Sequence, residues 1–145
     1  MSAPDSAQQN VPMVALSWGE VIDKITILEI KRQRLSSADA IANVEHELAA
    51  LNKVVADASV PAALVDLKMP LKAINEKLWD IENQIRAKEA QSIFDSAFIE
   101  LARSVYINND QRAKLKRAIN ELLNSELVEE KQYTTYAAQK SLSAV

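Results

Sequence analysis

The chain contains no cysteine, and only one glycine and one histidine among its 145 residues. Without cysteine it can form no disulfide, use no thiol nucleophile and hold no cysteine-ligated zinc. A loop that cradles phosphate needs several glycines, so a single glycine argues against Walker and Rossmann nucleotide sites. Any chemistry must therefore rely on carboxylates, lysine, arginine, tyrosine or serine, or on a metal held by oxygen atoms.

The sequence also lacks long apolar runs and an excess of positive charge. No stretch approaches the roughly 18 consecutive apolar residues of a membrane span, and the first residues do not show the basic-then-apolar pattern of a secretory signal. The formal net charge is −3 and the pI about 5.2, which argues against nucleic acid or an anionic membrane as the main partner. We expect a cytoplasmic protein with no membrane role.

Residues 17–35, SWGEVIDKITILEIKRQRL, form the segment around which we expect the rest of the chain to fold. Ser17 followed three residues later by Glu20 is a capping box, which predicts a helix start. On a helical wheel the valine, isoleucine and leucine side chains of this segment surround most of the helix. A helix that is apolar almost all round usually lies inside a bundle.

The following segments have the periodicity of further helices. Residues 36–56 have apolar positions spaced alternately by three and four, with a second capping box expected at Ser36 and Asp39, and residues 64–85 repeat that spacing through Pro70. Proline inside a helix removes a hydrogen bond, so we expect either a kinked helix or a nearly collinear pair of helices there. We expect Asp95 to cap a fourth helix that Asn108 and Asn109 end, and a fifth helix to follow.

These observations predict an all-α fold, an antiparallel bundle of four to five helices with largely coiled-coil-type seams. We divide the chain into a disordered or extended tail over residues 1–16, a helical bundle domain over residues 17–133, and a flexible tail over residues 134–145. The chain is long enough for one domain with a substantial core.

Two carboxylates interrupt the apolar faces of the first expected helix. Asp23 falls between Ile27 and Ile30 on the wheel, and Glu29 falls between Ile22 and Ile25. A buried carboxylate must find a partner or take up a proton, so Asp23 and Glu29 are candidate catalytic residues. The segment also resembles the first helix of helical chorismate mutases, which bind a dicarboxylate with cations from several helices. The cations that would have to converge here are Arg32, Arg34, Lys72, Arg86, Arg103, Arg112 and Arg117.

A second carboxylate pair, Glu76 and Asp80, lies four residues apart on one helix face. Such pairs can hold Mg²⁺ or Mn²⁺. Helical nucleotide pyrophosphohydrolases combine an ExxE with an ExxD, and Glu20 with Asp23 forms an ExxD. The matching ExxE is missing at a suitable distance, so the simpler interpretation of Glu76 and Asp80 is a solvated face. A magnesium cofactor belongs only to this enzyme alternative, and otherwise we expect no cofactor.

Coiled-coil-type seams favour a protein that associates with a protein partner or with itself. We expect a dimer formed through the long third helix, with Leu71, Leu78 and Trp79 at the interface. The function we infer from the residues is therefore a helical interaction or assembly module, and the alternative is a small-molecule enzyme that uses helix-borne carboxylates.

Three segments in order carry a resemblance to a known family: SWGEVIDKITILEIKRQRL, LKAINEKLWDIENQIRAKE, and FDSAFIELARSVYINNDQRAKLKRAINELLNSELVEEKQY. They resemble a small all-helical family of bacteria and phages whose function is unknown. The resemblance extends from about Ser17 to Tyr133. It implies no activity, and it carries no catalytic residue over to this chain.

Overall fold

The computed structural model describes residues 10–136, and within this range the chain is helical with no strand. The helices are α1 (Trp18–Arg34), α2 (Ala38–Asp57), α3 (Val65–Ala90) and α4 (Ser96–Leu122), with a short 3-10 helix, η2 (Ala62–Leu64), before α3. The predicted all-α class is confirmed. The outer parts of both expected tails, residues 1–9 and 137–145, lie outside the described residues.

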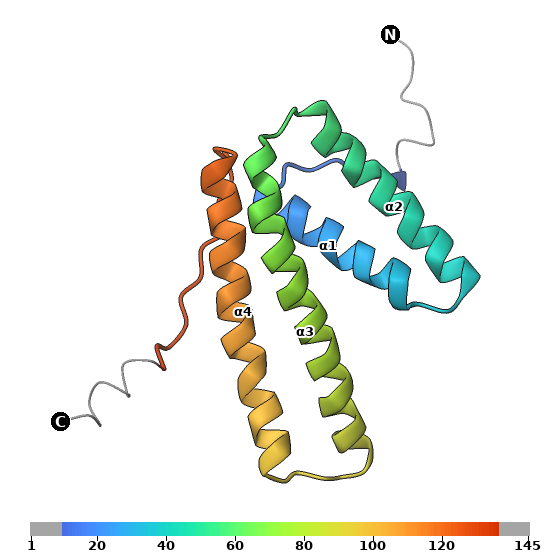
Figure 1. Cartoon of the computed structure of the whole chain (residues 1–145), viewed down its shortest axis with the longest axis vertical. Helices are drawn as coiled ribbons and strands as arrows, with labels where there is room; N and C mark the ends of the chain where they lie inside the picture. The colour runs from blue at the N-terminus through green and yellow to red at the C-terminus, as the bar shows by residue number, and fades with distance from the viewer. Residues whose placement is uncertain (1–9, 137–145) are drawn as a thin grey trace, which may run out of the picture.

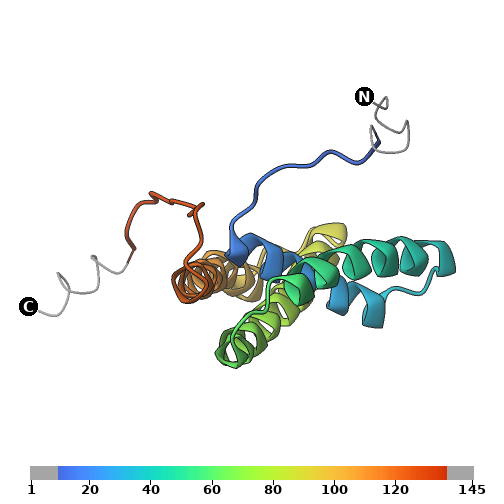
Figure 2. The same ribbon diagram turned by 90° about the horizontal axis from the view of Figure 1, so that it is seen from above.

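The four helices form two antiparallel hairpins. Figures 1 and 2 show the long α3–α4 hairpin and the shorter α1–α2 hairpin, which crosses it near the start of α3 and the end of α4. Helix α1 packs against α2, α3 and α4. It is therefore the element that joins the two hairpins, as its apolar surface predicted.

Helix α1 begins at the cap that the sequence predicts, and it is buried on nearly every side. The Ser17 hydroxyl accepts a hydrogen bond from the Glu20 backbone N–H at 3.2 Å, which confirms the predicted cap. The buried residues lie on nearly every side of the helix because three other helices cover it. They are Gly19, Val21, Ile22, Asp23, Ile25, Thr26, Leu28 and Ile30.

One apolar core lies where the two hairpins cross. Its buried members come from every helix and from η2: Val21, Ile22, Ile25, Leu28, Val44, Leu48, Leu64, Leu71 and Ile119. Each such side chain contributes roughly 1.5–3 kcal/mol on burial, so this cluster holds the crossing together. The coiled-coil character of the seams stays a prediction.

Helix α3 continues through Pro70 without a break. Proline provides no backbone N–H, so one hydrogen bond of the helix is missing at that turn.

The start of α2 differs in detail from expectation, because Ser37 caps this helix in place of Ser36. The Ser37 hydroxyl accepts from the Ala40 N–H at 3.4 Å.

The expected break at Asn108 and Asn109 is wrong, since α4 runs uninterrupted from Ser96 to Leu122. Asn108 is buried, and its side-chain amide donates to the Ser104 carbonyl at 2.7 Å within the helix. An asparagine costs a helix only about 0.7 kcal/mol relative to alanine, which packing against α3 and α1 readily offsets. Over residues 10–136 the bundle therefore has four α-helices, and the expected fifth is the second half of α4.

The α3–α4 hairpin extends well beyond the core. No residue from Glu82 to Ile107 is fully buried, so we define residues 82–107 as the arm. Asp95 caps α4 at its far end, with its carboxylate accepting from the Phe98 N–H at 2.9 Å. Phe94 packs edge-on against Phe98, with ring centroids 5.3 Å apart. None of the helices within residues 10–136 combines the length and hydropathy that a bilayer span requires.

Candidate functional site

A network of buried polar groups ties α1 to α3 and α4. Asp23 is 1% exposed, yet its carboxylate accepts from two nitrogens of Arg112, with Nε at 2.9 Å and Nη2 closer still. The Asn75 side-chain amide donates to Asp23 at 2.9 Å and to the Thr26 hydroxyl at 2.8 Å. These contacts supply what a buried carboxylate requires. The hydrogen bond to Asp23 raises the pKa of the Arg112 guanidinium.

Asp23 is therefore held in an ion pair with Arg112. Its carboxylate accepts from a guanidinium and from an amide, so both of its oxygens have partners within the fold, and its catalytic role stays a prediction. Arg34, the arginine that lies near Asp23 on the wheel, instead reaches α3, where it binds the carboxylate of Asp80 at 2.6 Å.

Glu29 also has cationic partners, and they come from another helix. Lys68 and Lys72 on α3 lie 2.7 and 3.3 Å from its two carboxylate oxygens. Burial acts to raise the pKa of Glu29, but the hydrogen bonds and charges of the two lysines outweigh burial, and the net pKa is lowered. A carboxylate of lowered pKa stays ionised at neutral pH, which suits an ion pair that joins α1 to α3.

The start of α1 is joined to the segment that follows α4. The Lys116 ammonium lies 2.8 Å from Glu20 and 3.1 Å from Glu129. Burial acts to lower the pKa of Lys116, but the hydrogen bonds to both carboxylates raise it overall. The backbone N–H of Trp18 donates to the Ser125 hydroxyl at 3.2 Å, which is a second contact between these two segments.

Gly19 marks the closest approach between α1 and α4. Its N–H donates to the Asn120 side-chain oxygen at 2.6 Å. A Cβ at this position would lie 2.5 Å from the Lys116 carbonyl oxygen and 3.0 Å from its carbon. Only glycine fits against this backbone, which explains the single glycine of the chain.

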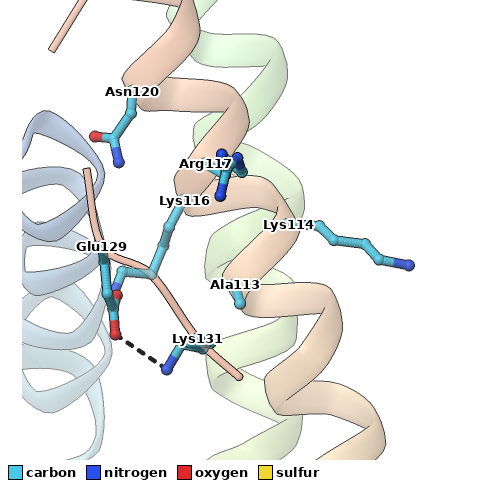
Figure 3. A pocket seen from close by; sticks show the side chains of 7 residues that line it. All are labelled: Ala113, Lys114, Lys116, Arg117, Asn120, Glu129 and Lys131. Carbon is cyan, nitrogen blue, oxygen red and sulfur yellow. Dashed lines mark hydrogen bonds and ion pairs between the residues drawn. The ribbon is translucent and has the colours of Figure 1, made fainter. Parts of the chain in front are cut away.

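Two openings lie along α4 beside the residues that follow it. The first, of about 150 Å³, is lined by Ala113, Lys114, Lys116, Arg117, Asn120, Glu129 and Lys131. Figure 3 shows Lys114 pointing away from it and Lys131 meeting Glu129 at 3.0 Å. Arg117 meets Glu130 at 3.2 Å. The four cations that line this opening form a basic cluster, and three of them are paired with carboxylates within the chain: Lys116, Arg117 and Lys131. That pairing disfavours the cluster as a nucleic-acid surface.

The second opening, of about 770 Å³, gathers all three tyrosines of the chain. Tyr106 and Tyr136 meet edge-on with ring centroids 5.3 Å apart. The Lys131 ammonium lies 5.8 Å from the centroid of the Tyr133 ring. Arg112 lines this opening from the α4 side.

A third cavity, of about 410 Å³, lies between α1, α3 and α4. Ile27 and Lys31 of α1 line one side, Leu78 and Trp79 of α3 another, and Arg112 of α4 a third. Of the seven cations that the sequence offered for a converging site, Arg86 and Arg112 meet here. Arg32, Lys72, Arg103 and Arg117 do not line it, and Arg34 lies over the Trp79 ring, 5.9 Å from its centroid.

A metal-binding role of the pair Glu76 and Asp80 stays a prediction. Asp80 lies at the surface in its ion pair with Arg34. Among residues 10–136 no cluster of three or more carboxylate, histidine or cysteine side chains is arranged to hold a metal ion.

The candidate interface residues divide between core and surface. Leu71 is 0% exposed and belongs to the core, so it has no surface to offer a partner, and that expectation is corrected. Leu78 and Trp79 are partly exposed and line the third cavity. Leu64 of η2 and Ile81 of α3, which belong to the same apolar spacing, are also buried within the chain. Part of this spacing is therefore used inside the fold, and a dimer through α3 stays a prediction.

Comparison with known proteins gives one match. A family model with the description Family of unknown function (DUF6165) matches residues 13–144. No curated protein and no solved structure matches the chain.

Proposed function

The chain belongs to this family of unknown function, and we propose that it is a protein-interaction module that binds a second copy of itself through the arm. The single observation that carries the proposal is an apolar stripe on the outer face of α4. Ile99, Ala102 and Tyr106 follow one another at intervals of three and four, which places them on one helix face, and all are exposed.

The stripe continues at the far end of the arm. Ile93 and Phe94 lie in the turn before α4, and Phe94 is 58% exposed. Ile99, at 55%, is similarly open to solvent. Contiguous exposed apolar residues mark interaction surfaces more often than single ones do. The carboxylates of Asp23 and Glu29 on α1 give no comparable support to an enzyme, because cations from α3 and α4 already pair with them.

The pattern of the stripe favours a second copy as the partner. It is nearly symmetric about Ala102, with larger apolar residues on both sides. When two α4 helices pack antiparallel about that point, Ile99 of one copy lies near Tyr106 of the other, and the two alanines allow a close approach. Such a surface complements itself, as a two-fold dimer interface requires. Two arms side by side would build a four-helix arrangement.

Sedimentation equilibrium of the full chain tests the proposal. The exposed stripe is small compared with the interface of about 1,200–2,000 Å² that a stable complex buries, so we expect a weak dimer that forms at tens of micromolar. The association should persist at about 0.5 M salt because it rests on apolar contact. A strict monomer at about 100 μM would contradict the proposal.

A further inference from the structure

The cavity between α1, α3 and α4 has the composition of a small-molecule site. Its volume of about 410 Å³ falls within the range of ligand pockets, which is roughly 300–1,000 Å³. Apolar and aromatic side chains line it together with a few polar groups, the combination that ligand pockets show. The lining residues are Ile27, Ile30, Lys31, Asn75, Leu78, Trp79, Glu82, Asn83, Arg86 and Arg112.

The charge of the lining points to an anion. Three cations, Lys31, Arg86 and Arg112, line the cavity. Glu82 pairs with Arg86 at 3.1 Å and Asp23 pairs with Arg112, so the Lys31 ammonium is the charge in excess. Lys31 is half-buried, and within residues 10–136 it forms no ion pair. A partly buried ammonium without a counter-ion favours binding of a negatively charged group. This local positive excess contrasts with the net charge of −3 of the whole chain.

Arg112 is held in position to bind a ligand. Its contacts with Asp23 use Nε and Nη2, so the second terminal nitrogen, Nη1, remains available to donate. The Asp23 carboxylate is almost fully buried and cannot follow the arginine outward, so it fixes the guanidinium plane. Its own partner Asn75 also lines the cavity. A pre-oriented arginine loses little entropy when it binds a carboxylate.

Trp79 forms part of the apolar lining of the cavity. The Arg34 guanidinium lies over its ring and is itself paired with Asp80, so both side chains are restrained. Leu78 and Ile27 extend the apolar surface next to the indole. A ligand with a flat aromatic ring or a short aliphatic chain fits against these apolar side chains.

We infer that this cavity binds a small organic anion, with its carboxylate between Arg112 and Lys31 and its apolar body against Trp79 and Leu78. The site is separate from the α4 stripe, so it can exist whether or not the chain forms a dimer.

The two tryptophans make the inference testable by NMR of the ¹⁵N-labelled full chain. Trp79 lines the cavity, whereas Trp18 packs against the core and serves as an internal reference. The probe is 3-phenylpropanoate. We expect a saturable shift of the Trp79 indole N–H at millimolar probe, with the Trp18 signal unchanged. The neutral 3-phenylpropanamide, and acetate, which lacks the apolar body, should each bind about tenfold more weakly or worse.

Matched lysine variants complete the test. Lys31→Gln should weaken 3-phenylpropanoate binding about tenfold. Lys77→Gln removes the same charge from an exposed position of α3 outside the cavity, and should change binding less than about twofold. The inference is overturned if the amide binds as well as the acid, if both indole signals move together, if the two lysine variants behave alike, or if no saturable shift occurs.

Discussion

Arg112 on α4 and Asp23 on α1 form a two-point ion pair across 89 positions of sequence, with Nε 2.9 Å from Oδ1. Asp23 lies inside the core crossing, and Arg112 reaches it from a position open to two cavities. The pair therefore connects the interior of the fold with two openings, of about 410 and 770 Å³. The contribution of this ion pair to the free energy of unfolding can be measured directly.

Replacing Arg112 by methionine should cost about 3 kcal/mol of unfolding free energy, because Asp23 then stays buried without its counter-charge. Urea denaturation followed by circular dichroism measures the loss. Arg103→Met removes an exposed arginine whose ion pair is with Glu100 three residues earlier; it is the control and should leave the free energy of unfolding close to that of the parent. Adding Asp23→Asn to Arg112→Met should recover part of the stability. A loss in Arg112→Met no larger than in the control would show that the pair does not hold the fold.

Gly19→Ala should destabilise the chain by about 1–3 kcal/mol, although alanine favours helix by about 1 kcal/mol over glycine. The added methyl would meet the Lys116 carbonyl at 2.5 Å, and backbone cannot rotate away as a side chain can. Thermal unfolding gives the sign of the change. An increase in Tm would mean that α1 and α4 are farther apart than described.

The ion pairs of Glu29 predict a dependence of stability on pH. Because the folded-state pKa of Glu29 is lowered, the unfolded chain binds more protons in the acid range. The contribution of Glu29 is fully present above its unfolded-state pKa and is lost as pH falls through the folded-state pKa. Glu29→Gln should therefore be less stable than the parent at pH 7, and the difference should shrink in acid.

Urea titrations at neutral and acid pH measure this difference. Glu45→Gln on α2, where the carboxylate is exposed, is the matched control and should change stability by less than about 0.5 kcal/mol at either pH. A deficit of Glu29→Gln that stays constant between the two pH values would contradict the role of the lysine pairs.

Ala102→Glu should abolish the proposed dimer, because it places two like charges at the centre of the two-fold contact. Since Ala102 is exposed on α4, the monomer should keep its Tm within a few degrees. Ala49→Glu makes the same change on exposed α2 and should leave the association intact. Sedimentation of the two variants separates the outcomes. Equal association of both would place the contact away from the α4 stripe.

The central position of α1 could be inferred from the sequence because its signals are local. The Ser17 cap and the isoleucines lie within a few turns of one another, and a helix apolar on all sides has to be enclosed. The need of Asp23 for a partner was equally evident. The identity of that partner was not, because the sequence contains 17 lysines and arginines and only the packing of α4 on α1 selects Arg112.

The end of α4 was misjudged for a related reason. Asn108 and Asn109 have modest helix propensity, and propensity is all that the local sequence gives. The burial of Asn108 depends on the helices that pack against α4, which no nearby residue reveals. The role of Leu71 was missed likewise, because a regular apolar seam shows that a face is covered without showing which chain covers it.

The order in which the ribosome makes these helices has a consequence for folding. Helix α1 emerges early, but Arg112, Lys116, Asn120 and Ser125, which satisfy its first turns, are translated roughly a hundred residues later. Until then the nascent chain presents an isoleucine-rich helix with an unmatched Asp23. Folding of this protein must therefore finish after synthesis of its last helix, and a stalled or truncated product would expose the surface that chaperones bind.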